Sequence, residues 1–285
     1  MNEIKSVSII GAGFTGKQIA AITALYRYNV SIFDINSEIL EDAKKYINGM
    51  LKRKEKPELI ENIQYYDEIE QAVNVADLVI EAIPENIELK KKVFSQIDRL
   101  APKNCIIATN SSSIPVSKIE DAVERKDKVL NIHFYPPIPL RPMADIMRGT
   151  KTSEDTFEKG KKWLESIGCK PIVVKREIIG FVFNRMWHAA RRQALDLWAG
   201  GHAEIETIDS AWKIFTGMAM GPFSLMDAIG LDVVYAVQMS YYNETGELRD
   251  KPPDALKDMV EKGDLGMKTG KGFYTWGKKK EKNKV

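Results

Sequence analysis

The sequence predicts an α/β fold in which a doubly wound, mostly parallel sheet is followed by an all-helical C-terminal domain. In the first part of the chain, short β-rich runs alternate with helical stretches. Several runs are continuously apolar, which is typical of strands buried on both faces. Later in the chain, apolar residues recur at the three- and four-residue spacing of helices. We therefore expect two domains, residues 1–177 and residues 178–285.

The expected elements follow from these patterns. Strands are expected at residues 6–10, 30–35, 64–66, 78–82, 106–109, 129–133, 144–147 and 172–174. Helices are expected in the first domain at residues 16–28, 87–100 and 116–123. The second domain should contain helices at residues 178–200, 203–215, 222–244 and 253–262, with a short strand at residues 273–276.

Composition narrows the class of protein. The 285 residues are 44% hydrophobic and 29% charged, as in a globular protein with a substantial core. The net charge of +2 gives no reason to expect nucleic acid as a partner. No apolar run reaches the roughly 20 residues that span a bilayer, so no membrane association is expected. Cys105 and Cys169 lack metal-binding spacing, and we expect two reduced thiols, no metal, no signal peptide and a cytoplasmic protein.

A glycine-rich loop follows the first expected strand. Gly11, Gly13 and Gly16 form the pattern G-x-G-x-x-G, with Phe14 and Thr15 inside it, and a helix follows directly. In this pattern the first glycine allows a sharp turn, and the second lets a pyrophosphate approach the backbone. The third lets the helix pack closely on the strand. The loop and its flanking elements therefore predict a Rossmann-type dinucleotide site.

The second expected strand carries an acidic residue, Asp34, near its end. Its distance from the glycine loop is close to the roughly 20 residues expected of the acid that binds the ribose hydroxyls. A carboxylate here would repel a 2′-phosphate, and Asn36 offers no positive charge to bind one. The alternative is an ordinary turn with a surface aspartate. The order of strand, loop, helix, strand and acid favours NAD as the cofactor.

An NAD site implies hydride transfer, and oxidation of an alcohol also needs a base. Histidine suits this role near neutral pH. Of the three histidines, His133 lies at the carboxyl end of an expected strand, where ligands bind in open α/β sheets. His188 falls inside an expected helix, and His202 follows two glycines in a turn. Position favours His133 as the base, and the alternative is a structural histidine.

A catalytic histidine needs an acceptor that fixes its tautomer and stabilises its cation. Asp145, Asp127 and Glu154 are candidates, and sequence position alone does not choose among them. Residues 110–113 read Asn-Ser-Ser-Ser after another expected strand and would place hydroxyl donors at the same sheet edge. Their alternative role is a helix cap.

Taken together, these segments resemble the L-3-hydroxyacyl-CoA dehydrogenase family over nearly the whole chain. The segments that carry the resemblance are residues 11–16, 77–90, 108–113, 133–134, 180–185, 220–227 and 268–274. The resemblance implies an NAD-binding Rossmann domain and a helical domain that commonly makes the contact of a homodimer. It also implies an active site in the cleft between the two domains.

The resemblance assigns roles to individual residues. His133 would be the general base, and Ser112 and Asn184 would hydrogen-bond the substrate oxygen. Four further residues match positions near the cofactor: Glu85, Lys90, Asn110 and Lys268. The acidic partner of the histidine falls at Asp145, where the family normally has glutamate. Because aspartate is one methylene shorter, we expect a backbone shift or a bridging water between Asp145 and His133.

Two departures from the family bear on the substrate. The family's His-Phe-Phe-Asn-Pro is His-Phe-Tyr-Pro-Pro at residues 133–137, which loses an amide near the cofactor. Residues 46–63 are shorter than the helical hairpin that helps to hold CoA, and the basic residues at 52–56 could meet phosphates or form a solvated face. These departures resemble the branch that acts on β-hydroxy acids or diketo esters.

The sequence thus predicts an NAD-dependent oxidoreductase that interconverts an L-3-hydroxyacyl substrate, by default a CoA thioester, and its 3-keto form. The alternative is a β-hydroxy acid or β-keto ester oxidoreductase without CoA. A non-enzymatic NAD(H)-binding structural or sensor protein is a more remote reading.

Overall fold

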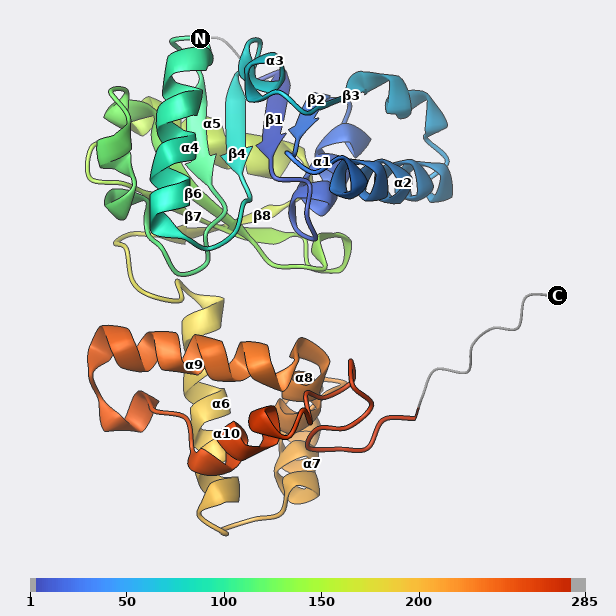
Figure 1. Cartoon of the computed structure of the whole chain (residues 1–285), viewed down its shortest axis with the longest axis vertical. Helices are drawn as coiled ribbons and strands as arrows, with labels where there is room; N and C mark the ends of the chain where they lie inside the picture. The colour runs from blue at the N-terminus through green and yellow to red at the C-terminus, as the bar shows by residue number, and fades with distance from the viewer. Residues whose placement is uncertain (1–3, 278–285) are drawn as a thin grey trace, which may run out of the picture. The chain divides into compact units, whose positions relative to one another are not determined.

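The structure is a computed structural model that describes residues 4–277 (Figure 1). The chain separates between Val182 and Phe183 into two compact units. The first unit is built on a mostly parallel sheet with helices on both faces, and the second is helical. The predicted fold class is therefore confirmed.

One eight-stranded sheet organises the first unit, with the strand order β3-β2-β1-β4-β5-β6-β7-β8. Every neighbouring pair is parallel except β6 and β7, which are antiparallel. Each strand matches an expected one in place. The strands are β1 (Ser6–Ile10), β2 (Asn29–Phe33), β3 (Ile63–Tyr66), β4 (Leu78–Glu81), β5 (Ile106–Thr109), β6 (Val129–Phe134), β7 (Met143–Arg148) and β8 (Lys170–Val174).

Helices cover both faces of this sheet (Figure 1). One face packs against α1 (Gly16–Leu25), α2 (Ser37–Arg53) and α5 (Glu154–Ser166), and the other against α3 (Ile69–Val73) and α4 (Ile87–Leu100). Alternate strand residues supply the two cores, so the central strands are buried on both sides. This explains why their sequences are continuously apolar. Because β1, β2, β4, β5 and β6 are mutually parallel, their carboxyl ends lie along one edge.

The second unit contains α6 (Phe183–Ala199), α7 (Ile205–Thr216), α8 (Pro222–Ile229), α9 (Leu231–Thr245) and α10 (Asp254–Glu261). Their apolar faces meet in a core of buried residues: Ala194, Leu195, Phe223, Met226, Leu231, Val234 and Leu256. In the part of the chain described, no helix has both the length and the apolar character that crossing a membrane requires.

Two helices of the second unit have other bounds than expected, and in both cases a glycine with positive φ lies at the boundary. The helix expected at residues 222–244 is two helices, because Gly230 has a φ of 104° and ends α8 before α9 begins. The helix expected from residue 178 begins at Phe183 instead. Gly180 and Phe181 just before it have φ values of 75° and 53°, which no right-handed helix accommodates.

Two other expected elements, the helix at residues 116–123 and the strand at residues 273–276, do not form. In both segments, backbone amides donate to carboxylates of residues distant in sequence. Residues 116–123 form the short 3₁₀ helices η2 (Val116–Lys118) and η3 (Glu120–Ala122), and the Ser117 amide donates to the Glu177 carboxylate at 3.0 Å. Residues 273–276 form no strand, since the amides of Phe273 and Tyr274 donate to the Asp227 carboxylate instead of to a neighbouring strand. Strand pairing there is limited to isolated bridges.

Candidate active site

A cavity of about 770 Å³ opens at the carboxyl edge of the sheet, between the ends of β1, β2, β4, β5 and β6. Ten of the residues expected at the site line it: Gly11, Gly13, Phe14, Thr15, Asp34, Glu85, Lys90, Asn110, Ser112 and His133. Gly16 and Asp145 are buried behind its wall. Asn184 and Lys268 belong to the second unit, where Lys268 Nζ lies 2.5 Å from Asp232 Oδ1.

The glycine loop has the geometry that a pyrophosphate needs. A Cβ on Gly11, which has a φ of 101°, would lie 2.6 Å from the Ala82 carbonyl oxygen. A Cβ on Gly16 would lie 1.8 Å from the Gly11 carbonyl oxygen, so α1 can begin here only with glycine. At Gly13, by contrast, a Cβ would meet nothing within 4 Å and would project into open space. The open space beside Gly13, in front of the amino end of α1, fits an anionic phosphate group.

Asp34 lies at the end of β2 and both of its oxygens accept backbone hydrogen bonds. Oδ2 accepts from the Ala12 amide at 2.9 Å, and Oδ1 accepts from the Asn36 amide at 3.0 Å. The carboxylate is therefore fixed beside the glycine loop, on the cavity wall. It can accept further hydrogen bonds from ribose hydroxyls, and its negative charge disfavours a 2′-phosphate. The residues present fit NAD.

Gln18 was missed by the sequence reasoning. Its buried side chain donates from Nε2 to the Phe14 carbonyl at 2.9 Å and accepts at Oε1 from the Ile138 amide at 2.9 Å. It thereby ties the glycine loop to the segment after β6. No signal in the sequence pointed to it, since a glutamine in a helix ordinarily belongs to the polar face.

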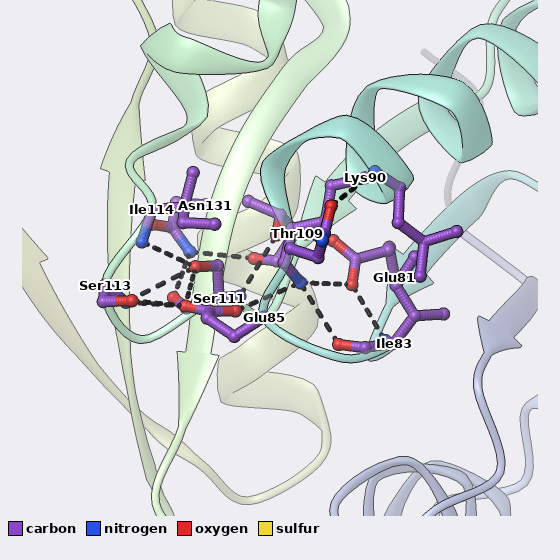
Figure 2. A network of polar contacts seen from close by, with 11 residues as sticks. Glu81, Ile83, Glu85, Lys90, Thr109, Ser111, Ser113, Ile114 and Asn131 are labelled. Atoms are coloured by element: carbon purple, nitrogen blue, oxygen red, sulfur yellow. Dashed lines mark hydrogen bonds and ion pairs between the residues drawn. The ribbon is translucent and has the colours of Figure 1, made fainter. Parts of the chain in front are cut away.

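A polar network includes Lys90 and Glu85 of the cavity wall and joins them to buried residues of β4 and β5 (Figure 2). Lys90 is almost fully buried, and its Nζ lies 2.6 Å from Glu81 Oε1 and 3.2 Å from Glu85 Oε2. Glu81 Oε2 accepts a hydrogen bond from the Thr109 hydroxyl at 2.7 Å. Burial raises the pKa of Glu81, and Lys90 and Thr109 act against that shift. Sequence reasoning missed Glu81, although a glutamate inside an apolar strand was a usable signal.

Glu85 continues this network to the residues after β5. Its Oε1 accepts hydrogen bonds from the Ser111 and Ser113 hydroxyls (Figure 2). Burial favours the neutral form of Glu85, but Lys90 and the two serines hold its pKa below the usual range. Ser111 also accepts from the Ile114 amide, so the expected capping role belongs to a turn rather than to a helix. Ser112 is left exposed on the cavity wall.

His133 and Asp145 face each other across the antiparallel pair β6 and β7, as directly opposed residues of the register. His133 Nδ1 lies 3.3 Å from Asp145 Oδ2. Asp145 is fully buried, and His133 is 6% exposed on the cavity wall. Within residues 4–277, no side chain or backbone group hydrogen-bonds His133 Nε2. A neutral imidazole that donates from Nδ1 to a carboxylate has a lone pair at Nε2 for a substrate proton.

The sheet register selects Asp145 from the three acidic candidates. Glu154 pairs with Arg148 at 2.7 Å, and Asp127 lies 3.9 Å from Lys128. The contact between Asp145 and His133 is direct, so the expected bridging water is not needed. The remaining expected residue at this edge, Asn110, accepts a hydrogen bond from the Phe134 amide at 2.9 Å and joins β5 to β6.

Models of the two domains of one protein family match the two parts of the chain. The model of the 3-hydroxyacyl-CoA dehydrogenase NAD binding domain matches residues 6–178, and that of the family's C-terminal domain matches residues 180–276. The chain is 33% identical to the mitochondrial hydroxyacyl-coenzyme A dehydrogenase of Mus musculus, over 96% of this chain and 91% of that protein.

Two solved structures have the same fold over 97% of this chain. The (S)-3-hydroxybutyryl-CoA dehydrogenase PaaH1 of Ralstonia eutropha is 32% identical with a TM-score of 0.90, covering 97% of this chain and 100% of that one. A diketoreductase that acts on dicarbonyl compounds is 33% identical with a TM-score of 0.86 and the same coverage. This chain belongs to the 3-hydroxyacyl-CoA dehydrogenase family, and residues 6–178 are the NAD-binding domain of that family.

Proposed function

We propose that this NAD-dependent dehydrogenase interconverts an L-3-hydroxyacyl substrate, by default a CoA thioester, and its 3-keto form, with His133 as the general acid and base. One observation carries the proposal: His133, backed by the buried Asp145, lies on the wall of the same cavity that the glycine loop lines. The base and the cofactor loop therefore share one space, as hydride transfer with coupled proton transfer requires.

Cofactor binding is assigned to the glycine loop, Asp34 and the network after β4. The Gly13 backbone and the start of α1 would hold the pyrophosphate, and Asp34 would accept from the ribose hydroxyls. Glu85, Lys90 and Asn110 would lie near the nicotinamide end, since they line the same cavity as His133. When bound, NAD supplies the hydride acceptor in oxidation and the hydride donor in reduction.

Proton transfer is assigned to His133. In oxidation, Nε2 takes the proton of the 3-hydroxyl as C3 loses its hydride, and in reduction the imidazolium returns the proton to the same oxygen. Asp145 stabilises the imidazolium and fixes the tautomer that leaves Nε2 free for the substrate. Ser112 would donate to the substrate oxygen from the cavity wall, and the family resemblance gives Asn184 the same role.

A substrate without CoA is the second candidate, and one observation favours it. After α2, residues 54–62 form a turn and the short 3₁₀ helix η1 (Pro57–Asn62) rather than a second long helix. The elongated hairpin that would support a CoA group is therefore lacking from this described segment. The hydride and proton chemistry is the same for both candidates.

Steady-state rates decide between the two. Acetoacetyl-CoA and an acetoacetate ester are each reduced with NADH under the same conditions, and kcat/KM is compared. A higher value for the thioester supports the CoA substrate. Turnover of the ester with none of the thioester would exclude it and leave the β-keto ester reading. Turnover of neither substrate, with NADH still bound, contradicts both.

We propose further that residues 1–177 form the cofactor domain and residues 178–285 the substrate and dimerisation domain of a cytoplasmic homodimer. Support for the dimer comes from α7, where Ile214 is 85% exposed and Phe215 is 91% exposed. The buried free thiols Cys105 and Cys169 support a reducing compartment. Sedimentation of the wild type and Phe215→Glu tests the dimer: a monomeric wild type contradicts it, and dissociation by the substitution supports this interface.

A further inference from the structure

The residue after β6, Tyr135, contacts both members of the His133–Asp145 pair. Its hydroxyl donates to Asp145 Oδ2, the same oxygen that His133 Nδ1 approaches. Its ring meets the imidazole edge to face, with centroids 4.6 Å apart and an angle of 75° between the planes. Tyr135 is itself buried. One side chain therefore touches the imidazole and also the carboxylate that orients it.

Asp145 needs such a donor. Its side chain is fully buried, and Asp145 Oδ1 has no hydrogen-bond partner within residues 4–277. A buried carboxylate stays ionised only where hydrogen bonds or charges compensate for lost hydration. An ionised carboxylate accepts and does not donate, so the Tyr135 hydroxyl must be the donor. Oδ2 thus receives the stabilisation that Oδ1 lacks.

The histidine contact alone holds the pair loosely. Charge-assisted N–H···O bonds are typically about 2.7–2.9 Å long, whereas His133 Nδ1 and Asp145 Oδ2 are 3.3 Å apart. A carboxylate held by this contact alone could rotate and carry the imidazole with it. The Tyr135 hydroxyl fixes Oδ2, and the Tyr135 ring limits rotation of the imidazole.

We propose that Tyr135 is a positioning residue for the base: its hydroxyl holds the Asp145 carboxylate in place, so that His133 presents Nε2 to the substrate oxygen. This inference rests on the proposed role of His133. Tyr135 acts through Asp145 and transfers no proton itself, so its contribution should depend entirely on the carboxylate.

A double-mutant cycle tests this dependence, using Tyr135→Phe, Asp145→Asn and the double variant. We expect Tyr135→Phe to lower kcat about tenfold, the scale of one hydrogen bond to a charged group. KM for the 3-keto substrate and the NADH dissociation constant should stay within about twofold. In the Asp145→Asn background, the same Tyr135→Phe change should have no further effect, because the charge it serves is gone.

Tyr28→Phe is the matched control, since its hydroxyl bonds Ser166 and lines no part of the cavity. It should leave kcat unchanged. The inference is overturned if Tyr135→Phe keeps wild-type kcat, if its loss multiplies with that of Asp145→Asn, or if it raises KM or weakens NADH binding instead. His133→Asn separates the two proposals: if it stays active, the proposed base is wrong, whereas an inactive His133→Asn beside a fully active Tyr135→Phe overturns the positioning role alone.

Discussion

His133 in the sheet unit and His188 in the helical unit have closely similar surroundings. Both are buried, at 6% and 5% exposure, and each lies near an aspartate, at 3.3 Å from Asp145 and 3.2 Å from Asp250. Each also packs on a tyrosine ring: Tyr135 edge to face for His133, and Tyr241 stacked at 3.7 Å for His188. Burial and an acidic neighbour therefore do not distinguish a base from a structural histidine.

The second ring nitrogen makes the difference. His188 Nδ1 accepts from Arg191 Nη2 at 3.1 Å while Nε2 bonds Asp250, so both nitrogens are engaged. His133 uses Nδ1 alone within residues 4–277, and its ring lies on the cavity wall. Proton transfer needs a nitrogen that a substrate can reach. The comparison therefore supports the proposed catalytic role of His133 and favours a structural role for His188.

Substitution of the two histidines should change kcat very differently. His133→Asn should lower kcat about 1000-fold, within the range for loss of a general acid or base, with NADH still bound. His188→Asn is the matched substitution and should keep kcat within about threefold. Initial rates and NADH fluorescence titrations measure both. Equal losses of kcat in the two variants would contradict the different roles proposed for His133 and His188.

The next effect compares the two aspartates. Asp145→Asn keeps the shape of the side chain but removes the charge that stabilises the imidazolium, and kcat should fall about 100-fold. The thermal midpoint should change little, because the residue's Oδ1 already lacks a partner in the described chain. Turnover kinetics and a thermal melt on the same preparation test this. Full activity in the variant would contradict the role of Asp145.

Asp250→Asn should affect stability instead of turnover. Asp250 accepts from Arg192 at 2.7 Å and from Thr245 at 2.8 Å besides contacting His188, so the substitution leaves the half-buried guanidinium of Arg192 without its counter-charge. We expect a loss of about 2 kcal/mol in unfolding free energy, as for hydrogen bonds to charged groups, with kcat close to that of the wild type. Urea titration gives the first quantity. A large fall in kcat of the folded variant would place this cluster in catalysis.

The smallest effect is a pH dependence of stability. Burial lowers the pKa of His188 from its usual value, so between that usual pKa of about 6.5 and the lower folded pKa the unfolded chain binds a proton that the folded protein does not. Stability should therefore fall as pH drops from about 7 to 5, by at most about 1.4 kcal/mol per unit of pKa difference.

Asp250 should not titrate in that window, because bonds from Thr245, His188 and Arg192 outweigh the effect of burial and keep its pKa below the usual range. The matched measurement is urea titration of His188→Asn over the same pH range. In this variant, the contribution of His188 to the change of unfolding free energy with pH should vanish. If the unfolding free energy changes with pH equally in the wild type and in His188→Asn, His188 has the same pKa in the folded and unfolded states.

Much of the candidate site could be predicted because the glycine loop and parallel strands obey local rules. Gly11, Gly13 and Asp34 are recognisable from spacing, and the apolar runs mark the strands whose ends gather them on one edge. Gln18 and Thr109 could not be found this way. Their partners, the Ile138 amide and the Glu81 carboxylate, are distant in sequence, and nothing local distinguishes a buried polar side chain from an exposed one.

Local periodicity and motif spacing are enough to predict the fold class, the cofactor loop and the preference for His133. Tertiary structure decided among the acidic partners. Asp145 faces His133 because β6 and β7 run antiparallel in one register, which composition and spacing do not reveal. Tyr135 follows β6 directly, and its hydroxyl reaches Asp145 because this pairing places the two strands side by side.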